Sequence, residues 1–298
     1  MRLAVTGREG QLVRSLVEVA ADEAGVEVIP VGRPDFDLLD PDRSANGLRS
    51  LAPDAIVNAA AYTAVDEAES ERDLAFRINA DGPAALARIA RDMDIPFIQI
   101  STDYVFDGRK DEPYSEDDLT NPLGVYGRSK LEGEERVRAE QPQHLIIRTA
   151  WVYSPFGRNF LKTMTGLAGT RDEVAVVNDQ HGSPTSALDL AKGLGRIFRC
   201  WTERNRTGLG ETYHLTGSGE ATWSGFAEEI FRACESMGVP HTGVRPITTE
   251  EWPTKAVRPR NSRLDCSKFA ADFDFRMPQW QESTREVVGR VISATSKA

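Results

Sequence analysis

Short apolar runs alternate with longer amphipathic segments through the first half of the chain. Residues 2–6 and 26–31 predict buried strands, and between them apolar residues recur every three or four positions over 11–24, a spacing typical of a helix. The same alternation predicts further strands at 54–61, 96–101 and 144–153, with helices at about 73–93 and around Tyr126. Apolar strands separated by helices favour an α/β fold in which a doubly wound parallel sheet is covered on both faces. Such a sheet binds its ligands at the carboxyl ends of its strands.

The end of the chain predicts a smaller lobe. Residues 222–238 have the pattern of an amphipathic helix, proline-containing loops follow, and a terminal helix is expected near 284–294. We expect a dinucleotide-binding domain over 1–150, with about 175–216 returning to it, and a C-terminal substrate-binding lobe made of about 151–174 and 217–298. Trp223, Trp252 and Trp280 are expected to pack within this lobe.

Composition narrows the choice of function. The 298 residues carry a formal net charge of -10 and no Lys/Arg-rich tract, which opposes general binding to nucleic acid. No apolar run is long enough for a membrane helix and the first residues lack a signal-peptide pattern, so a cytoplasmic protein without membrane contact is expected. The three cysteines are far apart in the sequence, which suggests neither a disulfide framework nor a metal site.

A glycine turn follows the first predicted strand. Gly7 and Gly10 allow the backbone to turn tightly and to approach a pyrophosphate at the start of the next helix. Val13 stands where a third glycine often lies, and a plain strand-to-helix turn remains the alternative. After the second strand, Arg33 occupies the place where an acid would bind a ribose 2′-hydroxyl. It either meets a 2′-phosphate, which favours NADPH, or is a solvated loop cation.

Tyr126 and Lys130 are one helical turn apart and can address one ligand together. A nearby ammonium favours the phenolate and is expected to lower the tyrosine pKa, which suits acid/base chemistry at a carbonyl group. The same spacing also occurs by chance in helices that have no catalytic role. Thr102 lies at the carboxyl end of the preceding predicted strand, where its hydroxyl can bond the same substrate oxygen.

Taken in order, the glycine turn, the hydroxyls after a later strand and the Tyr-x-x-x-Lys pair resemble the extended short-chain dehydrogenase/reductases, which have a Rossmann-type sheet. Further segments are similar to one family within them, the dTDP-4-dehydrorhamnose reductases, and cover nearly the whole chain. These segments are VNAAAYTAVDEAE (57–69), STDYVFDG (101–108), NPLGVYGRSKLEGE (121–134), RTAWVY (148–153), VVNDQHGSPT (176–185) and RPRNSRLD (258–265).

The resemblance implies roles for individual residues. The catalytic residues it implies are Thr102, Tyr126 and Lys130. From the glycine turn, Arg33 and the resemblance together, the residues expected to bind cofactor are Gly7, Gly10, Gln11, Leu12, Arg33, Asp37, Leu38, Ala61, Tyr62, Thr63, Tyr126 and Lys130. Those implied to bind substrate are Val65, Thr102, Asp103, Tyr126, Trp151, Asn178, Arg258 and Asn261. For Asn178 and the 258–261 stretch the alternative is a purely structural role in turns.

The resemblance implies an NAD(P)H-dependent oxidoreductase of dTDP-rhamnose biosynthesis. It would reduce the 4-keto group of dTDP-6-deoxy-L-lyxo-4-hexulose to dTDP-L-rhamnose with NADPH, or with NADH as well. No metal is expected, because Ser15 and Leu188 stand where some members carry acidic side chains, and the oligomeric state is left open.

Alternative functions make different demands on the sequence near Thr102. A dehydratase would need an acidic pair after Thr102, and an epimerase using a cysteine acid would need a cysteine nearby; Tyr104 follows Asp103 and no cysteine is close. The remaining alternatives are reduction of another nucleotide keto sugar and a partner-binding module like the regulatory subunit of methionine adenosyltransferase.

Overall fold

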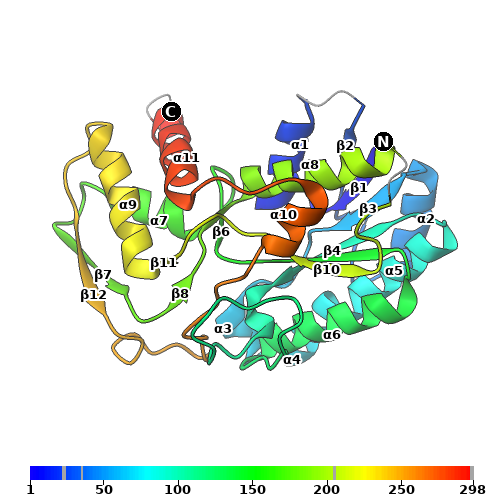
Figure 1. Ribbon diagram of the computed structural model, residues 1–298, viewed down its shortest axis with the longest axis horizontal. Helices are drawn as coiled ribbons and strands as arrows, with labels where there is room; N and C mark the ends of the chain where they lie inside the picture. The colour runs from blue at the N-terminus through cyan, green and yellow to red at the C-terminus, as the bar shows by residue number, and fades with distance from the viewer. Residues whose placement is uncertain (22–24, 35, 204–205, 296–298) are drawn as a thin grey trace.

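The computed structural model describes residues 1–21, 25–34, 36–203 and 206–295. Its central sheet has six parallel strands in the order β2-β1-β3-β4-β5-β10 (Figure 1). Their bounds are β1 Arg2–Thr6, β2 Glu27–Val31, β3 Ala55–Asn58, β4 Phe97–Thr102, β5 His144–Thr149 and β10 Glu211–His214. The predicted α/β fold is confirmed, and the strand order reverses between β1 and β3, where ligands bind in such sheets.

Helices cover both faces of this sheet, because each presents one apolar stripe to it. On one face, α1 (Gln11–Ala21) and α8 (Ala187–Thr202) enclose the first core; on the other lie α2 (Pro41–Leu51), α5 (Gly82–Asp92) and α6 (Val125–Glu140) (Figure 1). Residues 22–24 of the predicted first helix lie outside the described part of the chain.

The helix predicted at about 73–93 is interrupted. It runs as α4 (Arg72–Phe76), a π-helical turn η1 (Arg77–Asp81) and then α5. Pro83 in the first turn of α5 has no N–H to donate to the carbonyl of Asn79, and its ring would clash with that carbonyl in a regular helix. The wider turn avoids this clash and leaves Asn79 buried.

A second core lies beside the sheet. It is formed by α7 (Phe160–Leu167), α9 (Trp223–Ser236) and α11 (Trp280–Thr295), next to β7 (Glu173–Val177) paired with β12 (Gly243–Ile247) (Figure 1). By contrast, α10 (Ser267–Phe273) packs its phenylalanines into the first core. The remaining short elements are α3 (Val65–Ala68), η2 (Asp103–Val105), β6 (Val152–Tyr153), β8 (His181–Gly182), β9 (Thr185–Ser186) and β11 (Ala221–Thr222).

Two expectations for this half of the chain are wrong. Trp252 is 59% exposed rather than packed, whereas Trp280 is buried in the second core. The strand predicted over 144–153 ends at Thr149, because Trp151 has a positive φ of 46° that turns the chain before β6 pairs with β9.

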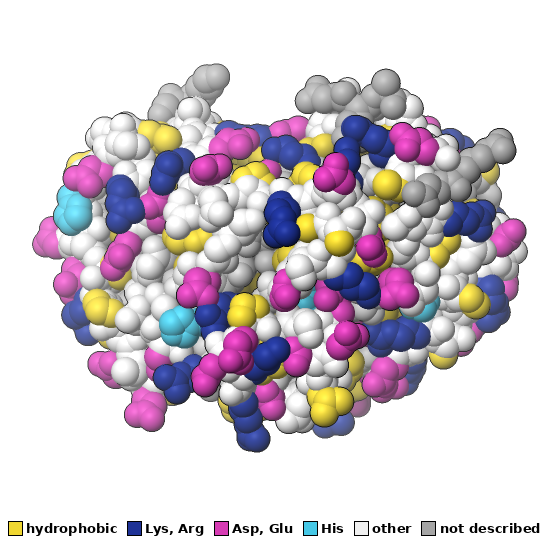
Figure 2. Space-filling view, in the orientation of Figure 1, with side chains coloured by type: hydrophobic (Ala, Val, Ile, Leu, Met, Phe, Trp, Pro, Cys, Tyr) yellow, Lys and Arg dark blue, Asp and Glu magenta, His cyan; other side chains and the backbone are white. Residues whose placement is uncertain are grey.

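The surface carries no dominant charge on the face shown in Figure 2, where Lys and Arg side chains alternate with Asp and Glu. Among the described residues, no helix combines the length and apolarity of a membrane span.

Candidate functional site

The candidate chemistry lies where β4 ends and α6 begins. Thr102, the last residue of β4, accepts a hydrogen bond from the amide of Tyr104 (3.2 Å) and so caps η2. The start of α6 is fixed by Glu69, whose carboxylate accepts from the amide of Val125 (2.7 Å). Tyr126 therefore projects from the first turn of α6 beside the end of β4, as the parallel sheet predicts.

Lys130 is buried, and its ammonium donates a hydrogen bond to the carbonyl oxygen of Ile100 (2.7 Å). Burial lowers the pKa of Lys130 to about 8, and the negative charge of Glu134 opposes this. Glu134 itself is fully buried between Arg148 (2.7 Å) and Ser101 (2.5 Å). An anchored carboxylate one turn further along α6 thus helps to keep the lysine charged.

Tyr126 is half-buried, with its ring edge-on to Tyr104 at 5.6 Å between centroids. The expectation of a lowered pKa for this phenol is wrong for this structure, because burial outweighs the attraction of the Lys130 ammonium. Burial raises the pKa of Tyr126, and the nearby charge of Asp103 adds to the increase, although the nearby Thr102 hydroxyl opposes both. The phenol consequently stays protonated at neutral pH, as a proton donor requires.

The glycine turn has the shape expected of a phosphate-binding loop. Gly7 has φ +104°, a conformation that side chains disfavour, and a Cβ at Gly32 would lie 3.1 Å from the Arg8 side chain. The amide end of α1 follows at Gln11, whose side-chain oxygen accepts hydrogen bonds from Ser154 and Asn159 (both 2.9 Å). Leu12 packs into the first core. The side chains of Gln11 and Leu12 are therefore occupied within the protein, and their backbone remains available.

The other predicted cofactor residues lie near the same sheet edge. Tyr62, after β3, exchanges hydrogen bonds with buried Asn79: its amide donates to Oδ1 (2.8 Å) and its carbonyl accepts from Nδ2 (3.1 Å). Ala61 is half-buried and Thr63 exposed on either side of it. Arg33 lies exposed just after β2. Asp37 accepts from the amide of Leu39 (3.0 Å) and so fixes a local turn, and Leu38 contacts Gly82.

A cavity of about 530 Å³ lies beside α3, whose Asp66 forms part of its lining. Its volume is typical of small-molecule sites. It is lined mainly by aromatic and apolar side chains of α7, β7, the start of α9 and the 247–258 segment, among them Phe160, Trp223 and Trp252. Arg258 lines it too, and donates to the hydroxyl of Tyr104 (3.0 Å) and to Asp66 (2.8 Å).

The remaining substrate candidates are Trp151, Val65 and two asparagines, and they lie in different surroundings. Trp151 stacks on Trp223 with ring centroids 3.6 Å apart, so it lies next to this cavity. Val65 is half-buried at the start of α3. Asn178 accepts hydrogen bonds from Thr222 and Ser224, and Asn261 donates to the carbonyls of Lys110 (2.7 Å) and Glu112 (2.9 Å). The two asparagines thus make the turn-fixing contacts of the structural alternative.

Sequence reasoning missed Tyr104, Asn79 and Phe160 as parts of the site. Asn79 also donates to Ser129 (3.0 Å), whose hydroxyl in turn donates to the carbonyl of Tyr126 (2.8 Å). The position of Tyr104 directly after Thr102 and Asp103 was the available signal for that residue. Nothing local in the sequence marks the other two.

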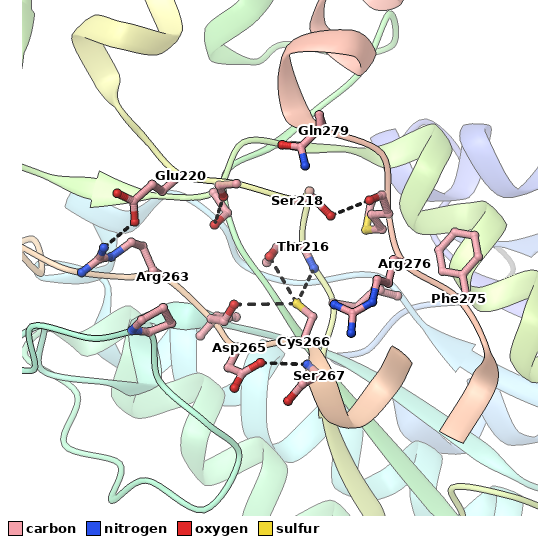
Figure 3. A pocket seen from close by; sticks show the side chains of 17 residues that line it. Thr216, Ser218, Glu220, Arg263, Asp265, Cys266, Ser267, Phe275, Arg276 and Gln279 are labelled. Carbon is pink, nitrogen blue, oxygen red and sulfur yellow. Dashed lines mark hydrogen bonds and ion pairs between the residues drawn. The ribbon is translucent and has the colours of Figure 1, made fainter. Parts of the chain in front are cut away.

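A second cavity, of about 460 Å³, lies beyond the end of β10 and contains none of the predicted catalytic residues. Figure 3 shows Arg263, Arg276 and Cys266 around it, with Cys266 hydrogen-bonded to Thr216. Within the described ranges, no three His, Cys, Asp or Glu side chains gather as a metal site requires.

Comparison with known proteins gives this geometry a context. The family model for the RmlD substrate binding domain matches residues 1–293. A dTDP-4-dehydrorhamnose reductase from Sinorhizobium fredii is 49% identical over 292 residues, with 98% of each chain covered. The chain belongs to the dTDP-4-dehydrorhamnose reductase family.

Solved structures of other family members have the same fold. The reductase from Clostridium acetobutylicum is 40% identical, covers 98% of this chain and 100% of its own, and superposes with a TM-score of 0.89. The reductase from Bacillus anthracis, solved in complex with NADP, is 33% identical and covers 97% of this chain and 99% of its own, with a TM-score of 0.88. The Rossmann-type architecture predicted from the sequence is thereby confirmed.

Proposed function

We propose that this protein reduces the 4-keto group of dTDP-6-deoxy-L-lyxo-4-hexulose to give dTDP-L-rhamnose, with NADPH as the reductant. The observation that carries the proposal is the placement of Thr102, Tyr126 and Lys130 at one edge of the sheet, in a chain that matches this reductase family along almost its whole length.

The residues at the start of α1 fit a dinucleotide. Gly7 and Gly10 keep side chains away from the helix end, where backbone amides can hold a pyrophosphate. Arg33, exposed after β2, suits a 2′-phosphate, which supports NADPH while leaving NADH as a second reductant. Bound there, NADPH supplies the hydride for the keto carbon.

The protein supplies the proton and holds the substrate. Tyr126 donates the proton of its hydroxyl to the keto oxygen as negative charge develops on it, and its raised pKa keeps that proton in place beforehand. Lys130, charged below about pH 8, stabilises the phenolate that results. Thr102 donates a hydrogen bond to the same oxygen. The aromatic cavity beside Arg258 is suited to a nucleoside diphosphate, with the arginine available to its negative charge.

Replacing Tyr126→Phe tests the proton donor. General acid catalysis contributes roughly 10²- to 10⁴-fold, so turnover should fall by about that factor while NADPH affinity remains. Turnover is measured by NADPH oxidation and affinity by titration. As a matched control, Tyr114→Phe removes a hydroxyl that donates to Asp107 (2.9 Å) and should leave turnover nearly unchanged. Equal turnover in the Tyr126 variant and the unmodified protein would exclude this role.

The overall reaction is tested with enzymatically made dTDP-6-deoxy-L-lyxo-4-hexulose, following NADPH and NADH oxidation and identifying the sugar product by NMR. Formation of dTDP-L-rhamnose supports the proposal, and the ratio of the two rates tests Arg33. Nucleotide binding without any turnover would favour another keto sugar or a partner-binding protein instead.

A further inference from the structure

The single hydrogen of the Thr102 hydroxyl is already committed in this structure. Its Oγ1 donates to Oδ1 of Asp103 (2.8 Å) and accepts from the amide of Tyr104 (3.2 Å). A hydroxyl has one donor, so Thr102 cannot also donate to a keto oxygen while Asp103 accepts its hydrogen. The proposed hydrogen bond to the substrate therefore requires this pair to change.

Asp103 is placed where a carboxylate is poorly stabilised. It is only 2% exposed, and Oδ2 has no hydrogen-bond partner in the described part of the chain. Ser262 approaches the carboxyl group, but its hydroxyl donates to the carbonyl of His181 (3.3 Å). A buried carboxylate oxygen without a donor disfavours the charged form.

The titratable groups packed around Asp103 do not neutralise it. Tyr126 from α6 and Tyr104 from η2 are neutral acids whose pKa values are raised. Arg258 from the C-terminal segment is paired with Asp66 of α3 and with Tyr104, and Lys130 bonds the carbonyl of Ile100. Protonation is the remaining way for this carboxyl group to lose its charge.

We propose that Asp103 is a positioning residue that carries a proton in the productive complex, donates it in a hydrogen bond to Thr102, and so turns the Thr102 hydroxyl toward the keto oxygen. The inference rests on the proposed reductase function. No proton is consumed in this step, because Asp103 keeps its own hydrogen and only the direction of the hydrogen bond reverses.

The consequence is a dependence of activity on pH. Burial raises the pKa of Asp103 to about 6, against the nearby hydroxyls of Ser262 and Thr102 and the backbone amides of Asp103 and Tyr104, which lower it. The active form is the protonated one, so activity is full below this pKa and falls as pH rises through it. Since one oxyanion donor is worth roughly 10²- to 10³-fold, kcat should descend by about that factor to a lower plateau. A separate decrease near pH 8 belongs to Lys130.

The experiment measures kcat between about pH 5 and pH 9 for the unmodified protein and for Asp103→Asn, using the keto-sugar nucleotide and NADPH. NADPH deuterated at the transferred position is run in parallel, so that the isotope effect identifies hydride transfer as the step observed. The amide introduced by Asp103→Asn always has a donor for Thr102. We expect this variant to lose the decrease near pH 6 and to keep the one near pH 8. Asp117→Asn, an exposed acid of the following loop, is the control and should keep both.

A Thr102→Val variant shows whether Asp103 acts through Thr102: its lower activity should lack the decrease near pH 6. Absence of that decrease in the active unmodified protein, or its persistence in either the Asp103 or the Thr102 variant, would overturn the proposal. Failure of the unmodified protein to oxidise NADPH at any pH would instead remove the proposed function, so the two failures are distinguishable.

Discussion

Gly127 lies between Tyr126 and Lys130 on α6, and replacing it with alanine should push α6 away from η2. A Cβ at this position would lie 2.9 Å from the Cβ of Pro122 and closer still to the carbonyl oxygen of Tyr104. To restore an ordinary carbon–oxygen separation of about 3.3 Å, the helix must move by about 1 Å. Such overpacking costs about 1–3 kcal/mol, against a gain of up to ~1 kcal/mol from the helix propensity of alanine. The net effect is therefore a loss of roughly 0–3 kcal/mol of stability.

The effect on catalysis should be large, because the same shift separates the phenol of Tyr126 from Thr102. A misplacement of about 1 Å can lower turnover on the order of 100-fold. Steady-state NADPH oxidation measures kcat, and urea unfolding measures stability. The control is Gly166→Ala in α7, where a Cβ meets nothing within 4 Å and turnover should not change. If Gly127→Ala retains full kcat with an unchanged unfolding midpoint, then α6 does not depend on this close approach to position Tyr126.

Two further substitutions test other buried contacts. Glu134→Gln leaves the guanidinium of Arg148 buried without its counter-charge and should lower the free energy of unfolding by about 3–5 kcal/mol, measured by urea titration. In the fraction that folds, loss of this negative charge lowers the pKa of Lys130 below about 8, so kcat should begin to fall at lower pH; an unchanged profile would contradict this link. Gly182→Ala places a methyl group against the ring of Trp151 and should raise KM for the sugar nucleotide roughly 10-fold or more, with NADPH affinity unaltered; equal shifts in both would indicate general damage.

The elements that the sequence predicted well are those fixed by local pattern. The strands ending at Thr6, Asn58 and Thr102 are short apolar runs, and all six sheet strands are parallel as helical connections require. The failures have nonlocal or steric causes. Trp151 reads as one more strand residue, yet its positive φ ends the strand, and the π-helical turn before Pro83 is invisible to apolar spacing.

The candidate site divides in the same way. Tyr126 and Lys130 are brought together by helical spacing, so the sequence places them on one face. Arg258 meets Asp66 across 192 positions of the chain, and no periodicity links two such residues. The predicted decrease of the Tyr126 pKa is also wrong. Burial outweighs the effect of the Lys130 ammonium, which already donates a hydrogen bond to the carbonyl of Ile100. Burial is a property of the assembled fold.

Trp151 follows β5 of the central sheet and packs against the second core, and this explains why its strained backbone is retained. A non-glycine residue at positive φ costs on the order of 1–3 kcal/mol, which the surrounding structure must offset. Trp223, at the start of α9 in the second core, stacks on the indole with the ring planes 8° apart, and Gly182 leaves room for the ring on another side. Neither contact forms unless the lobe is packed against the sheet. Trp151, two residues beyond the end of β5, is therefore held in place by the lobe, so damage to the second core should reach the proposed sugar site through Trp151 before it reaches Tyr126 and Lys130.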